Sequence, residues 1–322
     1  ESLMPFSCDA VAQILRYGAR LVEDKDKISL QFGKIRSLLM EADFWARKEG
    51  RDIVGPDEVV MAQRKQRHRH NLYEEKVMSQ FDDESVLLDV KGAETGQVNA
   101  LAVYSMGEIG FGRPTRITAE SYMGKPGIIN VEHESDLSGE THDKGVLILS
   151  GFLGRTFARN YPLSVTVSIT FEQSYDGVDG DSASSTELYA VLSSLSGIPI
   201  RQDIAVTGSV NQKGAIQAIG GVNEKIEGFF DTCVRKGLTN TQGVMIPASN
   251  VKNLVLRPAV VTAIEQGKFH LYSVKTIEQG IEVLTGVPAG VAGTDGAYPK
   301  DTVFGRVQQT LDRYHKLSQQ FS

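Results

Sequence analysis

The amino-acid sequence predicts an α/β domain of the α+β kind, preceded by a small all-α unit. Apolar side chains recur at helical spacing through the first 70 residues, and β-branched segments alternate with helical ones from about residue 85 to 285. We therefore expect an all-α subdomain over residues 1–80, an α/β domain over 81–285, and a linker with a short helix over 286–322.

The N-terminal unit is expected to be helical throughout. Residues 8–24 and 34–49 have the spacing of amphipathic helices, and Gly50 is placed to end the second one. Residues 55–58 (Gly-Pro-Asp-Glu) begin another helix, since proline and acidic side chains suit a first turn. The apolar face of the second helix carries Ile35, Leu38, Leu39, Ala42 and Ala46.

The second unit is expected to contain strands first and then alternating strands and helices. Residues 163–171 (LSVTVSITF) are the strongest strand prediction, because they alternate and are rich in β-branched side chains. Residues 286–300 are rich in Gly, Pro and Ala and predict a linker before a last amphipathic helix. The other expected strands cover residues 86–90, 98–103, 116–121, 128–133, 204–207 and 243–246, and the expected helices cover 183–197 and 222–236.

Composition argues against several classes of protein. No apolar run approaches the roughly 20 residues that cross a bilayer, and we see no signal peptide, so no membrane association is expected. The two cysteines are far apart, which favours a reducing, cytoplasmic setting over a disulfide framework. A net charge of −6 makes nucleic acid an unlikely partner. Because the chain begins with Glu1 rather than Met, we expect a fragment of a longer protein.

Common metal and phosphate motifs are missing from the sequence. The six histidines lack ligand spacing, and no G-x-x-x-x-G-K-[ST] occurs, so we predict neither a metal site nor a P-loop. One S-x-x-K, from Ser249 to Lys252, lacks its companion motifs and is interpreted as chance. The basic run over 64–70 could contact phosphate or nucleic acid, but a solvated helix end is the simpler interpretation.

The segment from Asp179 to Ser184 (DGDSAS) is a candidate nucleophile turn. It lies between a predicted strand and a predicted helix, where backbone N–H groups favour a developing oxyanion. A serine needs a base, so Ser182 could belong to a Ser-His-Asp triad or to a Ser-Lys dyad. Ser and Asp are also ordinary helix N-caps, and the segment alone does not decide among these alternatives.

Lys225 is the candidate base. It lies one turn into a predicted helix that Gly220 and Gly221 open, with Ile226 and Phe229 as apolar cover. Burial there could lower its pKa from about 10.4 toward the 7–8 that suits a general base. The alternative is a surface lysine paired with neighbouring glutamates.

Several blocks together resemble the proteolytic domain of Lon proteases over residues 95–285. The resemblance is closest to the LonB-type branch, whose nucleophile motif reads E/D-G-D-S-A-S. Ser182 and Lys225 are 43 residues apart, in agreement with the dyad spacing of that family. The matching blocks are 171–175 (FEQSY), 179–184 (DGDSAS), 196–199 (SGIP), 206–209 (VTGS) and 219–225 (IGGVNEK).

This resemblance implies a serine endopeptidase with a Ser-Lys dyad. Ser182 would attack the scissile carbonyl, and Lys225 would accept and later return the proton. Thr207 would hold the lysine amine in place.

The resemblance also suggests supporting groups. Asp179 would be a nearby carboxylate that modulates the dyad, and Glu120 is a weaker candidate for the same role. Backbone N–H groups around Asp181 and Ser182 would form the oxyanion hole. Asp181 stands where the other Lon branch has proline, so the details of that branch's loop are not carried over.

Residues 1–70 are similar to the helical lid of an AAA+ ATPase. The resemblance makes Arg36 either a sensor arginine that contacts a nucleotide phosphate or a plain helix-surface arginine. We expect no cofactor for this fragment, and ATP with Mg²⁺ for the full-length protein. The resemblance further implies a hexameric ring that degrades unfolded or damaged proteins in an ATP-dependent way. A binding or assembly module with a latent dyad is the rival interpretation.

Overall fold

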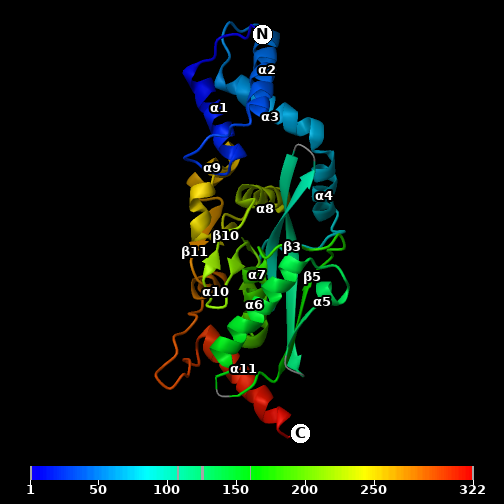
Figure 1. Cartoon of the computed structure of the whole chain (residues 1–322), viewed down its shortest axis with the longest axis vertical. Coiled ribbons are helices and arrows are strands. Elements are labelled where there is room, and N and C mark those ends of the chain that lie inside the picture. The colour runs from blue at the N-terminus through cyan, green and yellow to red at the C-terminus, as the bar shows by residue number, and fades with distance from the viewer. Residues whose placement is uncertain (1, 107–108, 125–126, 160, 321–322) are drawn as a thin grey trace.

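The computed structural model describes residues 2–106, 109–124, 127–159 and 161–320. The molecule is elongated, with the N-terminal helices at one end, a mixed sheet in the middle and the C-terminal helix at the other end (Figure 1). The predicted class, a mixed α/β fold behind a helical N-terminal unit, is confirmed.

The N-terminal unit contains α1 (Cys8–Leu21), α2 (Phe32–Lys48), α3 (Pro56–His70) and α4 (Leu72–Asp82). The Ser7 side chain caps α1 by accepting a hydrogen bond from the Ala10 N–H. Helices α1, α2 and α3 share a small core of their own, which includes the predicted Leu38, Ala42 and Ala46. Helix α4 was not predicted, and it packs against the second unit instead.

The central sheet has seven strands in the order β11-β10-β7-β2-β3-β5-β4. The strands β11, β10, β7 and β2 are parallel to one another, β3 is antiparallel to both β2 and β5, and β4 is parallel to β5. The bounds are β2 (Gln97–Met106), β3 (Ile109–Met123), β4 (Gly127–Asn130), β5 (Val165–Phe171), β7 (Ile204–Val206), β10 (Gly243–Pro247) and β11 (His270–Val274). Two small pairs join β1 (Ala93–Glu94) to β6 (Ile200–Arg201) and β8 (Ser209–Val210) to β9 (Ile216–Gln217).

Helices α7 (Ser184–Ser196) and α8 (Val222–Lys236) cover opposite faces of this sheet. Successive strand residues point to opposite faces. In β7, Val206 joins the core that contains α7, whereas its neighbour Ala205 joins the core that contains α8. Both helices begin near the carboxyl end of β7, and this placement brings residues from the two layers together.

The remaining helices of the second unit complete the two layers. Helix α11 packs against α7, and its Val303, Phe304 and Val307 belong to the same core. Gly197, in the left-handed conformation with φ 66°, ends α7 at the same residue as the helix predicted over 183–197. The bounds are α5 (Val131–Glu134), α6 (Glu140–Phe157), the 3₁₀ helix η1 (Ala248–Asn253), α9 (Pro258–Glu265), α10 (Ile277–Thr285) and α11 (Val303–Ser318).

Two strand predictions were wrong or too long. Residues 86–90 form no strand, although Leu88 and Val90 are buried. The backbone there bonds to side chains instead of a neighbouring strand: the Leu87 N–H donates to Gln173 Oε1 at 2.8 Å. The strand expected over 128–133 stops at Asn130, where α5 begins.

A close backbone contact fixes α8 on the sheet. A Cβ atom built at Gly112 of β3 would lie 2.1 Å from the Glu224 carbonyl oxygen, and one built at Gly228 of α8 would lie 2.1 Å from the Gly112 carbonyl oxygen. Only glycine allows an approach this close at these two positions. The glycine pair therefore sets the height of α8 above β3.

Candidate active site

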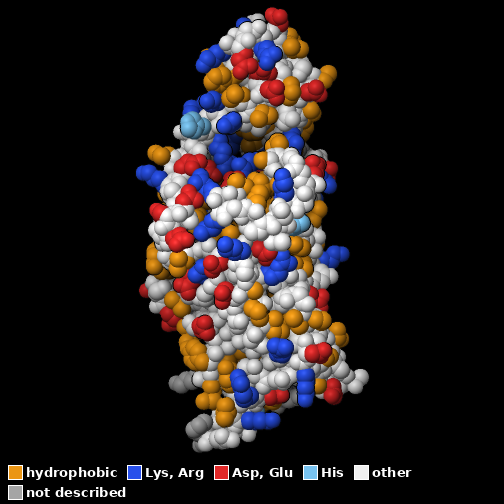
Figure 2. Space-filling view, turned by 180° about the vertical axis from the view of Figure 1, so that it is seen from behind, with side chains coloured by type: hydrophobic (Ala, Val, Ile, Leu, Met, Phe, Trp, Pro, Cys, Tyr) orange, Lys and Arg blue, Asp and Glu red, His pale blue; other side chains and the backbone are white. Residues whose placement is uncertain are grey.

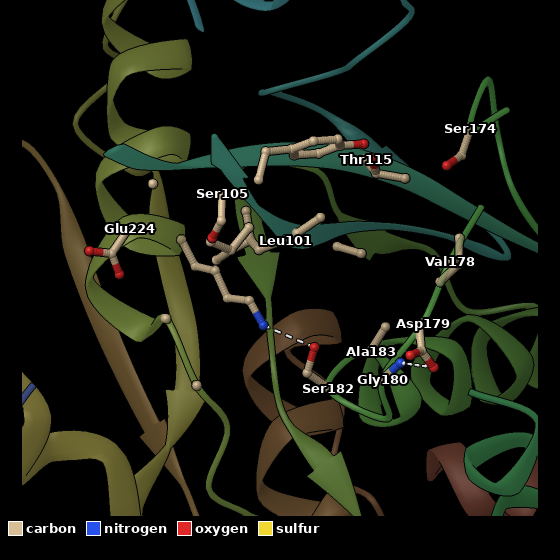
Figure 3. Close-up of a pocket in the computed structure, with 18 of the residues that line it drawn as sticks. Leu101, Ser105, Thr115, Ser174, Val178, Asp179, Gly180, Ser182, Ala183 and Glu224 are labelled. Carbon is tan, nitrogen blue, oxygen red and sulfur yellow. Dashed lines mark hydrogen bonds between the residues drawn. The ribbon is translucent and has the colours of Figure 1, made fainter. Parts of the chain in front are cut away.

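Ser182 and Lys225 meet through a hydrogen bond. The Lys225 Nζ donates to Ser182 Oγ at 2.9 Å and to Thr207 Oγ1 at 3.1 Å (Figure 3). Ser182 lies just before α7, Thr207 follows β7, and Lys225 lies in the first turn of α8. Three segments distant in sequence thus bring a nucleophile, a candidate base and a hydroxyl together.

The turn around Ser182 is held by backbone hydrogen bonds. Gly180 has φ 85°, a left-handed conformation that favours glycine, and its N–H donates to Asp179 Oδ1 at 2.7 Å. The Gly208 N–H donates to the Ser182 carbonyl at 2.8 Å, which ties the turn to the end of β7. The Ser182 hydroxyl is therefore presented at a fixed point at the start of α7.

Lys225 is positioned by the start of α8. Gly221, at φ 65°, turns the chain into the helix, and its carbonyl accepts the Lys225 N–H at 3.0 Å. The lysine side chain is almost wholly buried, with 3% of the residue exposed. Lys225 is therefore buried, and the surface-lysine alternative does not hold.

Burial lowers the pKa of Lys225 to about 8, because the charged ammonium loses water. The carboxylates of Asp181 and Glu23 act in the opposite direction and raise that pKa. A pKa near 8 leaves a useful share of neutral amine at slightly alkaline pH. The lysine therefore meets the electrostatic requirement of a general base.

The dyad opens onto a cavity of about 670 Å³. Strand β2 forms one wall through residues 100–105, and the loop over 174–180 faces it. In Figure 3, Ser105 and Leu101 lie on one side of the Ser182–Lys225 pair, and Val178 and Asp179 lie on the other. The cavity is open to solvent, and Ser182 and Lys225 are among the residues that line it.

The predicted supporting residues do not all reach the dyad. Thr207 does, and only 2% of it is exposed. Asp181 accepts a hydrogen bond from Ser209 Oγ at 2.7 Å and acts on Lys225 through its charge. Asp179 lines the cavity, but its carboxylate bonds to the Gly180 N–H.

Two further predicted residues lie elsewhere. Glu120 is exposed on β3, opposite Ser168 of β5, and it is not among the residues that line the cavity. Arg36 is exposed on α2, and its role as a sensor arginine stays a prediction. Within the described ranges, no group of three or more His, Cys, Asp or Glu side chains could hold a metal ion.

Sequence reasoning missed Glu23, which follows α1 and lines the same cavity as Ser182 and Lys225. Nothing local marks it, since it lies about 200 residues from the dyad helix and comes from the N-terminal unit. Its φ of 49° is unusual for a residue other than glycine, but only the folded chain reveals it.

Two arginines of the basic run over 64–70 are paired with acids. Arg67 forms an ion pair with Glu74, and Arg69 forms one with Glu41 at 2.6 Å. On the face shown in Figure 2, most Lys and Arg side chains are interspersed with Asp and Glu. These observations favour the solvated helix end over a nucleic-acid site.

A serine hydroxyl hydrogen-bonded to a buried lysine at an open cavity is the arrangement of a candidate Ser-Lys hydrolase. Residues 164–285 match the family model for the Lon protease (S16) C-terminal proteolytic domain, and residues 5–69 match the model for the AAA+ ATPase lid domain of archaeal LonB. The chain belongs to the Lon protease family, and its second unit contains the proteolytic domain.

Similar proteins support this assignment. A Lon protease homolog of Escherichia coli strain K12 is 39% identical over 218 residues, which is 67% of this chain and 37% of that protein. An archaeal Lon protease of Thermococcus kodakarensis is 29% identical over 311 residues, which is 96% of this chain and 45% of that protein. The chain therefore spans less than half the length of these relatives.

Among the described residues, no helix is both long enough and apolar enough to cross a membrane.

Proposed function

We propose that the chain is a serine endopeptidase that uses the Ser182–Lys225 dyad to hydrolyse peptide bonds. One observation carries the proposal: a buried lysine, with a pKa lowered to about 8, donates a 2.9 Å hydrogen bond to a serine at an open cavity. A neutral amine at this distance can take the serine proton as the hydroxyl attacks.

The reaction proceeds in two halves. Ser182 Oγ attacks the scissile carbonyl while Lys225 Nζ accepts its proton, and the tetrahedral intermediate collapses as Lys225 gives that proton to the leaving amine. Water then attacks the acyl-enzyme with Lys225 again as base, which frees the second product and restores Ser182. Thr207 orients the amine throughout, because it accepts one of the amine's hydrogen bonds.

The oxyanion is assigned to backbone N–H groups at the nucleophile turn, around Asp181 and Ser182. Two bonds fix this turn: the Ser184 N–H donates to the Asp181 carbonyl at 3.0 Å, and the Gly208 N–H donates to the Ser182 carbonyl. Preorganised donors of this kind stabilise the developing charge without reorganising during the reaction.

For the full-length protein we propose ATP-dependent degradation of unfolded or damaged proteins by a cytoplasmic hexameric ring. The match of residues 5–69 to an AAA+ lid supports this extension. ATP and Mg²⁺ would be bound mainly by ATPase residues outside this sequence, and Arg36 is the residue here that could approach a phosphate. A latent dyad that requires those residues is the rival possibility.

The test is cleavage of casein and of a short fluorogenic peptide by the 322-residue chain and by Ser182→Ala. We expect cleavage by the unaltered chain and none by the variant, with equal thermal melting of both. Cleavage that persists in Ser182→Ala would overturn the dyad. If neither protein cleaves, the same comparison is made in the full-length protein with ATP, where activity of both proteins would again exclude the dyad.

A further inference from the structure

An arginine of the N-terminal unit is hydrogen-bonded to side chains of the helix that carries Lys225. Arg20, near the end of α1, donates to Glu224 Oε1 at 2.7 Å and to both carboxylate oxygens of Glu227 at 2.7 and 3.0 Å. It also donates to the Val255 carbonyl at 2.6 Å. Glu224 and Glu227 flank Lys225 along α8, so one guanidinium from the lid-like unit holds both sides of the candidate base.

Glu23, three residues after Arg20, contacts the start of the same helix from the cavity side. Glu23 Oε2 accepts the Gly221 N–H at 3.4 Å, at the N-cap of α8. The Glu23 carbonyl accepts a 2.7 Å hydrogen bond from Asn253 Nδ2, which anchors the backbone despite its left-handed φ of 49°. Such strain persists only where surrounding contacts impose it.

The groups in this cluster are largely shielded from water. The Glu227 side chain is 4% exposed and the Arg20 side chain 22%. Glu227 has a second partner, because Arg257 Nε lies 3.2 Å from its Oε2. Glu224 has Arg20 as its cation, and its Oε2 has no hydrogen-bond partner within the described part of the chain. Glu224 is therefore the carboxylate that depends most on Arg20.

We propose that Arg20 and Glu23 are positioning residues for the dyad: they hold the first turn of α8, and with it the amine of Lys225, in register with Ser182. The inference rests on the proposed function. Movement of the N-terminal unit would loosen the turn and separate the amine from the serine. The lid-like unit thereby controls the competence of a proteolytic site that lies in another domain.

A simpler explanation is that Arg20 only docks the two units. Arg16 provides the matched control, because it lies one turn earlier on α1 and also bridges the units, donating to the Leu256 carbonyl at 3.0 Å. It has no bond to a carboxylate of α8 among the described contacts. A docking role predicts equal effects of Arg16→Ala and Arg20→Ala, whereas a positioning role predicts that only Arg20→Ala affects the chemistry.

The first readout is peptide cleavage. Arg20→Ala should lower kcat about tenfold to a hundredfold with KM little changed, since small displacements of a catalytic group cost that much. Arg20→Lys should recover only part of kcat. It keeps the positive charge, but one ammonium cannot bind both carboxylates as the guanidinium does. Arg16→Ala should stay within about twofold of the unaltered chain.

The second readout is the pKa of Lys225, followed by NMR of lysines labelled at Cε, and it needs no turnover. Asp181 and Glu23 are the charged groups that act on this amine, and Glu23 in turn interacts with Glu224 and with Arg20, which also pairs with Glu227. Arg20→Ala should raise the pKa, because a cation leaves and Glu224 is released, and Glu23→Gln should lower it, because an anion leaves. Arg16→Ala should not move it.

Opposite shifts from Arg20→Ala and Glu23→Gln, with none from Arg16→Ala, would support the inference. Equal behaviour of Arg20→Ala and Arg16→Ala in both readouts would overturn it. Ser182→Ala separates this failure from failure of the proposed function. If Ser182→Ala still cleaves, the proposed dyad is wrong. If Ser182→Ala is inactive and Arg20→Ala is unaffected, only the proposed role of the lid-like unit is wrong.

Discussion

Thr207 Oγ1 lies 3.1 Å from Lys225 Nζ, and the same hydroxyl donates to the Ser182 carbonyl at 3.3 Å. One side chain at the end of β7 therefore joins the candidate base to the nucleophile turn. Because Thr207 is buried, no water can replace it without displacing the chain around it. The hydroxyl is thus a structural link between two layers of the fold.

Replacing Thr207 with valine should lower kcat about tenfold to a hundredfold, because the isosteric side chain cannot hold the amine. Thr207→Ser keeps the hydroxyl and should retain most of the activity. Steady-state cleavage of a fluorogenic peptide by both variants tests this. A Thr207→Val enzyme with unchanged kcat would show that the amine needs no such partner.

Activity should rise about tenfold per pH unit and level off above pH 8, since Lys225 acts as the neutral amine and its pKa is about 8. Lys225→Arg should be as inactive as Lys225→Ala, because a guanidinium does not deprotonate in proteins. A pH–rate profile with these two variants checks the assignment. A working arginine variant would point to a different base.

A buried acid behind the nucleophile turn should make stability depend on pH. Glu187 is fully buried in α7, its Oε1 lies 3.6 Å from His142 Nε2, and burial together with Glu132 raises its pKa to about 8. Burial lowers the pKa of His142, which favours the neutral ring. Between about pH 4.5 and 8 the folded state retains a proton that the unfolded state has lost, so stability falls as pH rises.

Glu187→Gln should remove this dependence. Each pKa unit corresponds to about 1.4 kcal/mol. The free energy of unfolding of the variant, relative to that of the unaltered chain, should therefore increase as the pH rises from about 5 to 8. Urea denaturation at both pH values measures the difference. A constant difference between the two proteins would mean that Glu187 does not titrate in this range.

The glycine pair beneath α8 should tolerate no side chain. In Gly228→Ala the new methyl would overlap the backbone of Gly112, so α8 must lift and carry Lys225 away from Ser182. We expect loss of most activity and a lower melting temperature. Gly154→Ala in α6 is the control: its Cβ meets nothing within 4 Å, and it should be neutral or stabilising by up to about 1 kcal/mol.

The dyad could be predicted from the sequence because its signals are local. The turn at 179–184 and the glycines before Lys225 each mark their own segment, and the resemblance joined them. Helix α6 was missed, although Leu149, Phe152 and Leu153 are buried on one side of it. Glu23 could not be found, because its role arises from packing between two units rather than from neighbouring residues.

The failed strand over 86–90 shows the same limit. Alternating burial of Leu88 and Val90 satisfies a strand pattern, yet the Leu87 N–H is bonded to the side chain of Gln173, 86 residues away. Periodicity indicates which side chains face the core. It does not tell whether a neighbouring strand is there to accept the backbone hydrogen bonds.

The contact between α11 and α7 has a practical consequence for anyone who shortens this protein. The match to the proteolytic-domain model ends at residue 285, which suggests this residue as a point of truncation. A cut there would remove α11 and with it Phe304, whose ring packs edge to face on the Phe157 ring of α6 at 5.5 Å. It would also expose the apolar side of α7 that α11 covers. Such a truncated protein should aggregate, whereas tags added after residue 318 should be harmless.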